Sequence, residues 1–463
     1  MTAQETTDIF DPGLLFTKYK SAVERTDPIK HNGEVQRVRG LKIESRGPQA
    51  IVGELCQIIV SKEKTIWAEV IALEGHTVHL MTFEETEGIE IGCVVVAMGE
   101  TLSIPVSEKL LGRTIDFMGR PIDGKGDIGS SELYSIFQKA PDVIQRKKIQ
   151  QRITTGIRSI DGITPVGKGQ RLGVFSGSGI GKSTLIAMIA RNTSADVNVI
   201  ALIGERGREV REFIENDLGE EGLKRSVVVV SSSNLPPLAR LRGAYVATAI
   251  AEYFREKGND VMFLFDSVTR FARAQREIGL ASGEVPATRG FPPSVFSLLP
   301  QLLERCGTSA KGTITGFYSV LVEGDDMDEP IADTIRGILD GHVVLSRQIA
   351  QRYQYPAVDV LQSVSRLAEK VSGEKTKEAM GYLRRMIAVY REAEDLINVG
   401  AYVKGSNPEI DEAVEKIDAI RKFLTQGIYE KVTMEDTLKK AAEISGIDIP
   451  EQELKNEAVS LQT

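Results

Sequence analysis

A glycine-rich turn between an apolar stretch and a helical pattern constrains the fold of this chain more than any other feature. In this context the glycines let backbone N–H groups turn inward around a phosphate group, and the start of the helix adds a favourable dipole. We therefore predict a phosphate-binding loop in which Lys182 reaches the terminal phosphates of a nucleotide. Ser183 would offer its hydroxyl to Mg²⁺, with Thr184 as a second candidate. The loop reads Ser176-Gly177-Ser178-Gly179-Ile180-Gly181-Lys182-Ser183-Thr184.

The loop departs from the strict phosphate-loop pattern at one position, because Ser176 stands where that pattern has its first glycine. A chance Gly-Lys-Ser turn is the alternative interpretation. The order of strand, loop and helix favours the phosphate site.

Two acidic residues follow apolar stretches that we predict to be parallel strands. Asp266 ends the stretch 261–265, and Glu205 comes shortly after the stretch 198–203. Because open α/β sheets bind ligands at the carboxyl ends of their strands, Asp266 is a candidate Mg²⁺ ligand, for which a helix cap is the alternative. Glu205 is a candidate for orienting or deprotonating an attacking water. The alternative for Glu205 is an ordinary ion pair with a nearby arginine, namely Arg206, Arg208 or Arg211.

The hydrophobic pattern changes twice along the chain and predicts three structural regions. Short β-rich runs between residues 33 and 102 favour a small closed or nearly closed barrel. From residue 171, strands alternate with helices, which is typical of a parallel sheet wrapped by helices. The last region is helical. The expected barrel runs are 50–55, 57–60, 65–73, 77–83 and 93–98, and the expected C-terminal helices are 376–399, one from 407, and one from about 433 to 446.

The charge balance and hydropathy make two classes of protein less expected. Lys and Arg number 57 against 65 Asp and Glu, so the net charge is −8 and no nucleic-acid partner is expected. No stretch approaches the roughly 18 consecutive apolar residues of a membrane span, and residues 1–10 lack the pattern of a signal peptide. We therefore expect a cytosolic protein.

Taken together, the motifs resemble those of the cytosolic ATPases of flagellar and type III secretion export, relatives of the catalytic subunit of rotary ATP synthases. The resemblance spans nearly the whole chain. In that family a small residue commonly replaces the first loop glycine, as Ser176 does here. The most specific stretches besides the phosphate loop are 204–210 (Gly-Glu-Arg-Gly-Arg-Glu-Val), 266–277, 287–293, 323–326 (Glu-Gly-Asp-Asp) and 336–342 (Arg-Gly-Ile-Leu-Asp-Gly-His).

The resemblance implies residue roles that spacing alone does not show. Glu205 would be the catalytic carboxylate, with Arg206 and Arg270 as its positively charged neighbours. Arg366 would be an arginine finger inserted into the adjacent subunit's site. Tyr355 would stack on the adenine base. From the residues alone, Arg366 reads as a solvated surface charge and Tyr355 as a core aromatic beside a turn proline.

The resemblance also implies a homohexameric ring of multidomain subunits. A stalk-like coiled-coil partner would occupy the pore, which residues 280–286 would help to line. A regulatory partner would dock on residues 11–23, whose pattern predicts a short amphipathic helix; a frayed arm packed on its own domain is the alternative. The expected domains are a docking segment (1–26), a β-barrel (27–102), a RecA-like ATPase domain with a mainly parallel sheet (103–368) and a helical domain (369–463).

The function that the resemblance implies is Mg²⁺-dependent ATP hydrolysis that drives export of flagellar or type III secreted proteins. Export substrates and their chaperones would be partners, and the protein would lie peripherally at the inner-membrane export gate. The run 422–428 (Lys-Phe-Leu-Thr-Gln-Gly-Ile) favours the flagellar system. The alternatives are an ATP-synthase-like catalytic subunit, a Rho-like RNA-translocating motor and an inert nucleotide-binding scaffold.

Overall fold

The computed structural model describes residues 32–130, 132–322, 324 and 326–455. They form two compact units: the chain up to Thr82 with Thr86–Thr101, and Phe83–Glu85 with the chain from Leu102 onward. The segment 1–26, predicted to dock a regulatory partner, lies outside the described residues. The finer domain boundaries stay predictions.

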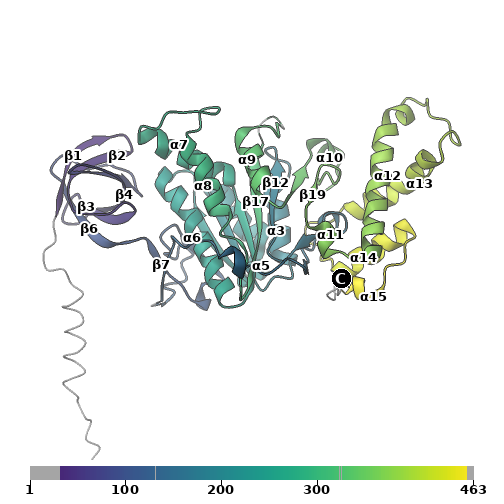
Figure 1. Ribbon diagram of the computed structural model, residues 1–463, viewed down its shortest axis with the longest axis horizontal. Helices are drawn as coiled ribbons and strands as arrows, with labels where there is room; N and C mark the ends of the chain where they lie inside the picture. The colour runs from purple at the N-terminus through teal and green to yellow at the C-terminus, as the bar shows by residue number, and fades with distance from the viewer. Residues whose placement is uncertain (1–31, 131, 323, 325, 456–463) are drawn as a thin grey trace, which may run out of the picture. The chain divides into compact units, whose positions relative to one another are not determined.

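The first unit is a closed antiparallel β-barrel, as the sequence predicts (Figure 1). Alternate side chains along its strands point inward, so that Val35, Ile43 and Ile58 are fully buried in one core. Closure pairs each strand on both sides and leaves no open sheet edge. In barrel order the strands are β1 (Gly33–Arg39), β2 (Lys42–Arg46), β5 (Thr77–Thr82), β4 (Thr65–Glu74), β3 (Glu54–Ile59) and β6 (Val94–Thr101).

Two of the predicted barrel runs are wrong in detail. The runs 50–55 and 57–60 are replaced by the single strand β3, because Gly53 adopts a left-handed conformation that ends a turn. Ile51 and Val52 lie in that turn with exposed side chains, so their β-branched character did not indicate a strand there. Strands β1 and β2 were not among the expected runs, because charged residues alternate with their few apolar ones.

A nine-stranded sheet forms the centre of the second unit in the described part of the chain. Its strands are parallel except for two short additions, β16 on β17 and β19 on β18. The phosphate loop leaves the carboxyl end of β12, in the interior of the sheet. In sheet order the strands are β19 (Val364–Ser365), β18 (Gly341–Leu345), β12 (Arg171–Ser176), β17 (Thr313–Leu321), β15 (Asp260–Asp266), β13 (Val197–Ile203), β14 (Ser226–Ser231) and β8 (Arg113–Asp116), with β16 (Gly307–Thr308) on β17.

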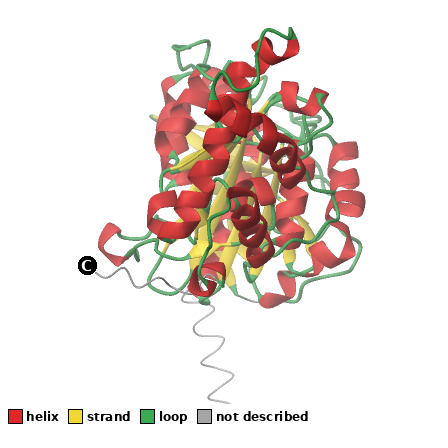
Figure 2. Cartoon of the chain, turned by 90° about the vertical axis from the view of Figure 1, so that its right-hand side faces the viewer, coloured by secondary structure: helices red, strands yellow, loops and turns green. Residues whose placement is uncertain are grey.

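Helices pack on both faces of this sheet, and Figure 2 shows the strands as a yellow layer among red helices. On one face Phe265 packs edge-on against Phe271 of α7. On the other face Leu264 shares a core with Ile186 of α3. Burial on both faces explains why the central strands are apolar throughout rather than alternating. The helices around the sheet are α2 (Arg158–Asp161), α3 (Lys182–Asn192), α4 (Gly207–Glu212), α5 (Gly219–Lys224), α6 (Pro237–Glu256), α7 (Val268–Ala281), α8 (Pro293–Leu303), α9 (Pro330–Ile338) and α10 (Arg347–Gln351).

The C-terminal part is helical, as predicted. Asn407 and Thr433 cap the N-termini of α13 and α14 through their side chains, and Gly446 ends α14 in a left-handed conformation. Leu383 of α12 and Ile420 of α13 belong to the same core as the phosphate-loop helix α3, so these helices are packed on the sheet domain. The helices are α11 (Ala368–Val371), α12 (Glu374–Asn398), α13 (Pro408–Leu424), α14 (Met434–Ser445) and α15 (Glu451–Leu454).

No helix among the described residues combines the length and hydrophobicity that a membrane span requires. Short elements complete the described chain. The remaining elements are β7 (Ser103–Pro105), β9 (Leu133–Ser135), β10 (Arg152–Ile153), β11 (Val166–Gly167), the 3₁₀ helices η1 (Glu108–Leu110) and η2 (Val143–Gln145), and the π-helix η3 (Phe213–Leu218).

Candidate active site

The phosphate loop has the backbone that its glycines predict. Gly179 and Gly181 have φ values of 78° and 101°, in the left-handed region that side chains with a Cβ rarely adopt. Ile180 between them is buried in the sheet core and anchors the loop. The loop therefore passes from β12 to the first turn of α3 with its amide groups around an open hollow, the arrangement that binds phosphate. Ser176 and Gly177 lie buried at its start, while Ser178, Ser183 and the partly exposed Thr184 lie nearer solvent.

Asp266, the last residue of β15, holds the lysine of the phosphate loop, although β17 lies between β15 and β12 in the sheet. Its Oδ1 lies 2.5 Å from Lys182 Nζ and also accepts a hydrogen bond from Ser319 Oγ at 2.7 Å. Its Oδ2 lies 3.5 Å from the Ser183 hydroxyl oxygen. The helix-cap alternative for Asp266 is wrong, because Ser267 caps α7 by accepting from the Arg270 amide. Asp266 thus faces the loop.

Glu205 lies beside the same lysine, with its Oε1 3.9 Å from Lys182 Nζ. Burial, the nearby Asp266 carboxylate and a hydrogen bond with the Glu209 side chain raise the pKa of Glu205 to about 7, against the opposing effect of Lys182 and Arg270. Its Oε1 accepts no hydrogen bond from any described residue. A buried carboxylate oxygen without a partner is costly unless a ligand or water supplies one.

The ion-pair alternative for Glu205 is not found in the described part of the chain. Arg206 lies 3.5 Å from Glu209, and Arg211 lies 2.8 Å from Glu215. Arg206, at the start of α4, is largely exposed. The Glu205 carboxylate therefore lies beside Lys182 and is not paired with Arg206 or Arg211.

Arg270 reaches the site because of the glycine that precedes Glu205. A Cβ on Gly204 would lie 2.8 Å from Arg270 Cβ, so the arginine can pack over this turn only when residue 204 is glycine. Gly204 also has a φ of 73°. The Nε of Arg270 is buried without a hydrogen-bond partner among the described residues. The Gly-Glu-Arg sequence thus makes room for a cation beside the carboxylate.

Lys182, Ser183, Glu205, Arg206 and Arg270 line an open cavity of about 690 Å³, within the size range of small-molecule sites. Asp266 is buried behind Lys182 and is not among the described lining residues. Two arginines that the sequence analysis did not single out, Arg273 and Arg347, also line it. Arg273 could have been found, because it follows Arg270 by three residues on α7 and so shares its face. Arg347 begins α10 after β18 and carries no local signal. The cationic lining suits a polyanionic ligand such as a nucleoside triphosphate.

The hydroxyl of Ser183, which lines the cavity, and the carboxylate of Asp266 behind it are oxygen donors that suit Mg²⁺. Ser183 and Asp266 place a hydroxyl and a carboxylate oxygen 3.5 Å apart beside the loop. No group of three or more His, Cys, Asp or Glu residues able to hold a metal occurs in the described residues. Mg²⁺ in nucleotide sites commonly takes one or two protein oxygens and completes its coordination with substrate phosphates and water.

Tyr355 and Arg366 are not among the described residues that line the cavity. The Tyr355 carbonyl accepts a hydrogen bond from the Gln426 amide at 2.8 Å, and the Tyr355 side chain is 43% exposed. Arg366 is exposed at the opposite edge of the sheet, where its amide donates to the Asp340 carbonyl at 3.0 Å. The structure therefore brings together the residues around the loop but leaves these two apart from it.

Three protein-family models match consecutive parts of the chain. Residues 35–99 match the β-barrel domain and residues 156–365 the nucleotide-binding domain of the ATP synthase alpha/beta family. Residues 372–443 match the C-terminal domain of the type III secretion ATPase EscN. A phosphate loop in this fold, beside an acidic residue at a strand end, defines a P-loop ATPase.

Whole-chain comparisons narrow the class. The chain is 56% identical to the flagellum-specific ATP synthase of Treponema pallidum (strain Nichols), over 94% of this chain and 98% of that protein. It is 49% identical to the type 3 secretion system ATPase of Xanthomonas euvesicatoria, over 88% and 92%. The structure of the assembled ATPase EscN from enteropathogenic E. coli superposes with a TM-score of 0.84 at 41% identity, covering 89% of this chain and all of that chain. The chain belongs to the family of flagellum-specific ATP synthases and type III secretion system ATPases.

Proposed function

We propose that this ATPase hydrolyses ATP to drive protein export, with Glu205 activating the attacking water. The observation that carries the proposal is the unpartnered Glu205 Oε1, 3.9 Å from Lys182 at the rim of the phosphate-loop cavity. A carboxylate with a pKa of about 7 is well matched to taking a proton near neutral pH.

In the proposed reaction, water attacks the γ-phosphorus of ATP and the bond from that phosphorus to the bridging oxygen of ADP breaks. Glu205 orients the water and accepts its proton. Lys182 and the loop amides hold the β- and γ-phosphates, and Arg206 and Arg270 lie next to the carboxylate. Ser183 and Asp266 would hold Mg²⁺, which when bound supplies positive charge to the phosphates. The products are ADP and inorganic phosphate.

Arg366 is proposed to complete the site of an adjacent subunit. Its amide is bonded to Asp340 at the amino edge of the sheet, whereas Lys182 lies at the carboxyl edge. The six residues of β12 span five steps of about 3.3 Å, which separates the two edges by roughly 16 Å. This separation supports action on a neighbouring copy rather than within one chain.

Tyr355 is proposed to contact the adenine base. Its partly exposed ring is available for stacking, and its carbonyl is tied to the loop that follows α13 through the Gln426 amide. The core aromatic alternative is less well supported by this exposure.

For assembly we propose a homohexamer with a central stalk-like partner. EscN has been described both assembled and in complex with its central stalk EscO, and that complex has a TM-score of 0.84 to this chain. Further proposed partners are export substrates, their chaperones and a regulatory protein at residues 1–26. The proposed location is the cytoplasm, at the periphery of the membrane export gate.

The flagellar system is the proposed setting, since flagellum-specific relatives from Treponema pallidum and Bacillus subtilis are 56% and 52% identical, against 49% for a type 3 secretion ATPase. The family membership weighs against a Rho-like RNA motor. An ATP-synthase-like catalytic subunit would require a distinct non-catalytic partner, which copurification tests.

Glu205→Gln tests the catalytic proposal because it keeps the shape of the side chain and removes its basicity. We expect hydrolysis to fall by about 10²–10⁴-fold while ATP still binds. Phosphate release and fluorescent-nucleotide binding measure the two properties. Near-normal turnover would remove Glu205 from the catalytic role.

A subunit-mixing experiment tests Arg366. Lys182→Ala subunits keep the arginine but lack a working phosphate loop, and Arg366→Ala subunits have the reverse defect. Each is expected to be inactive alone, and their mixture is expected to regain hydrolysis where the two kinds meet. Mixed rings without any rescue would contradict a finger supplied by a neighbour.

A further inference from the structure

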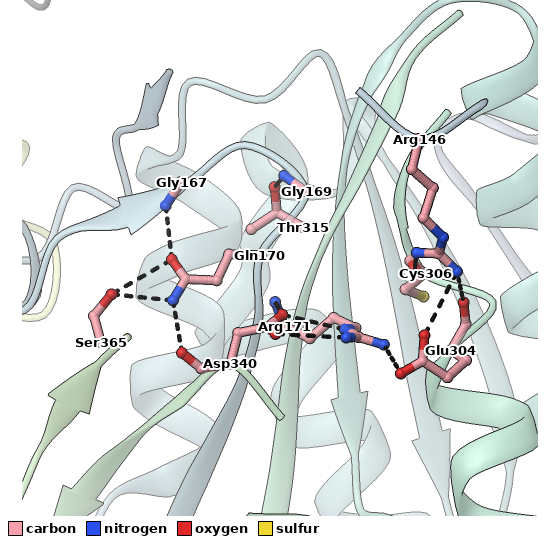
Figure 3. Close-up of polar contacts among 10 residues, drawn as sticks. All are labelled: Arg146, Gly167, Gly169, Gln170, Arg171, Glu304, Cys306, Thr315, Asp340 and Ser365. Atoms are coloured by element: carbon pink, nitrogen blue, oxygen red, sulfur yellow. Dashed lines mark hydrogen bonds and ion pairs between the residues drawn. The ribbon is translucent and has the colours of Figure 1, made fainter. Parts of the chain in front are cut away.

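A polar network occupies the amino edge of the sheet, opposite the phosphate loop (Figure 3). Its central member is Gln170, which directly precedes β12 and is 0% exposed. A buried amide is costly to keep unless its donors and acceptor are used. The contacts of Gln170 therefore indicate what the residue does.

Gln170 uses both amide donors and its acceptor. Its Nε2 donates to the Asp340 carbonyl at 3.0 Å and to Ser365 Oγ at 3.0 Å. Its Oε1 accepts from the Gly167 amide at 2.9 Å. Ser365 immediately precedes Arg366, so the side chain of Gln170 ties the base of the sheet to the residue before the proposed finger.

The Asp340 carbonyl is shared between Gln170 and the proposed finger. It also accepts the amide of Arg366 at 3.0 Å. The carboxylate of Asp340 is held by Arg171, whose Nε lies 3.2 Å from Oδ2. Arg171 reaches Glu304 on its other side at 2.6 Å, as Figure 3 shows. Asp340 is thus fixed by the sheet and in turn fixes the backbone of Arg366.

The strand that directly precedes Arg366 is short, although Ser363 before it is held by hydrogen bonds from the Arg384 guanidinium to its carbonyl and from the Val344 amide to its hydroxyl. β19 has only two residues and pairs with β18 through Gly341 and His342. A Cβ on Gly341 would lie 2.4 Å from the Val364 carbonyl, so the close approach of the two strands itself depends on a glycine. Arg366 is exposed, and its guanidinium donates to the Arg336 carbonyl at 3.3 Å.

From these contacts we propose that Gln170 is a positioning residue for Arg366, setting the direction in which the finger leaves the sheet edge. The inference rests on the proposed action of Arg366 on a neighbouring site. Gln170 has no part in the phosphate-loop cavity of its own chain, since it is not among the described residues that line it. Its loss would therefore impair the subunit that donates the finger and spare the subunit that receives it.

Subunit mixing tests this asymmetry directly. Gln170→Leu is introduced either into Lys182→Ala subunits, which donate the finger, or into Arg366→Ala subunits, which receive it. With the donor altered we expect rescued hydrolysis to fall at least tenfold. With the receiver altered we expect rescue within about twofold of the unaltered mixture, because that subunit's own arginine is already absent.

A matched control is Thr315→Val. Thr315 is fully buried at the same edge and accepts a hydrogen bond from the Gly169 amide at 2.9 Å, but its strand β17 is separated from β19 by β12 and β18. Its loss is expected to act equally in donor and receiver. If Gln170→Leu subunits fail to fold, Ser365→Ala removes one Gln170 contact near the surface and should show the same asymmetry, to a smaller extent.

The possible failures are distinguishable. No rescue in the unaltered mixture, with mixed rings present, overturns the proposed finger. With Gln170→Leu or Ser365→Ala, rescue could instead fall equally whether the donor or the receiver is altered. That result would overturn the positioning role of Gln170, while the proposed action of Arg366 on a neighbouring site would stand.

Discussion

Two clusters of buried polar groups, one around Glu205 at the carboxyl edge of the central sheet and one around Gln170 at its amino edge, differ in how far their members are hydrogen-bonded. At the carboxyl edge, Glu205 Oε1 and Arg270 Nε lack hydrogen-bond partners among the described residues. At the amino edge, Gln170 uses its whole amide and Asp340 is held by Arg171. Both edges are charged and both belong to the same strands.

This difference in hydrogen bonding indicates where a ligand is expected. A protein pays for unpartnered buried polar groups in stability, so they persist where a substrate completes them. Groups that satisfy one another instead rigidify the fold. Substitutions at the carboxyl edge should therefore change chemistry, and substitutions at the amino edge should change stability or the geometry of neighbouring copies.

Removal of divalent cations should produce the largest difference between the edges. We expect chelation to lower ATP hydrolysis at least 100-fold, with recovery on adding Mg²⁺, because the site's protein oxygens are few and the charge on the phosphates must be offset. The melting temperature of the nucleotide-free protein should not change. Phosphate release and thermal melts measure both, and a large loss of stability on chelation would point to a structural metal.

The pH dependence of hydrolysis should report on the carboxyl edge. Since burial and Asp266 raise the pKa of Glu205 to about 7, and the base must be ionised, kcat/KM should rise roughly tenfold per pH unit below pH 7 and level off above it. Arg270→Gln removes a positive charge that favours the carboxylate, so it should move the inflection to higher pH. A flat profile between pH 5.5 and 8 would rule out Glu205 as the base.

The smallest expected effect is a gain in the stability of the protein when Glu205, at the carboxyl edge, is replaced. The pKa of Glu205 is about 7 in the folded protein and has the ordinary value of 4.5 in the unfolded chain. Ionisation of Glu205 therefore lowers the free energy of unfolding. This loss grows between pH 4.5 and 7 and is complete above pH 7. Glu205→Gln should therefore raise the melting temperature of the nucleotide-free protein by roughly 2–4 °C at pH 8, with the gain vanishing toward pH 4.5.

Asp340→Asn is the matched change at the amino edge. It should lower the melting temperature, because the largely buried Arg171 loses part of its charge pairing. If both variants shifted the melting temperature in the same direction, the contrast between the edges would not hold.

Much of the fold and the site could be predicted because their signals are local. The loop at Lys182 is read from adjacent glycines, and Asp266 and Glu205 are marked by the apolar stretches before them. The C-terminal helices were predicted closely because Asn407, Pro408, Thr433 and Gly446 are strong end signals.

What could not be predicted depends on contacts between distant segments. Ser319 hydrogen-bonds Asp266 across 53 positions, yet in the sequence it is one polar residue in an apolar strand. β8 joins the far edge of the sheet from a glycine- and proline-containing connection, where nothing indicated a strand. The roles of Tyr355 and Arg366 came from the family resemblance and stay predictions, as does the segment at residues 11–23, which lies outside the described residues.

The sheet ends in very short strands on both sides, with two residues in β19 and four in β8. Exposed strand edges are templates for pairing with other chains, and the length of the free edge sets how readily such pairing nucleates aggregates. Ending the sheet in this way lets the apolar central strands stay long without offering that template. The chain should therefore stay soluble when crowded, and an insertion that lengthened β19 would be expected to promote fibrillar aggregation.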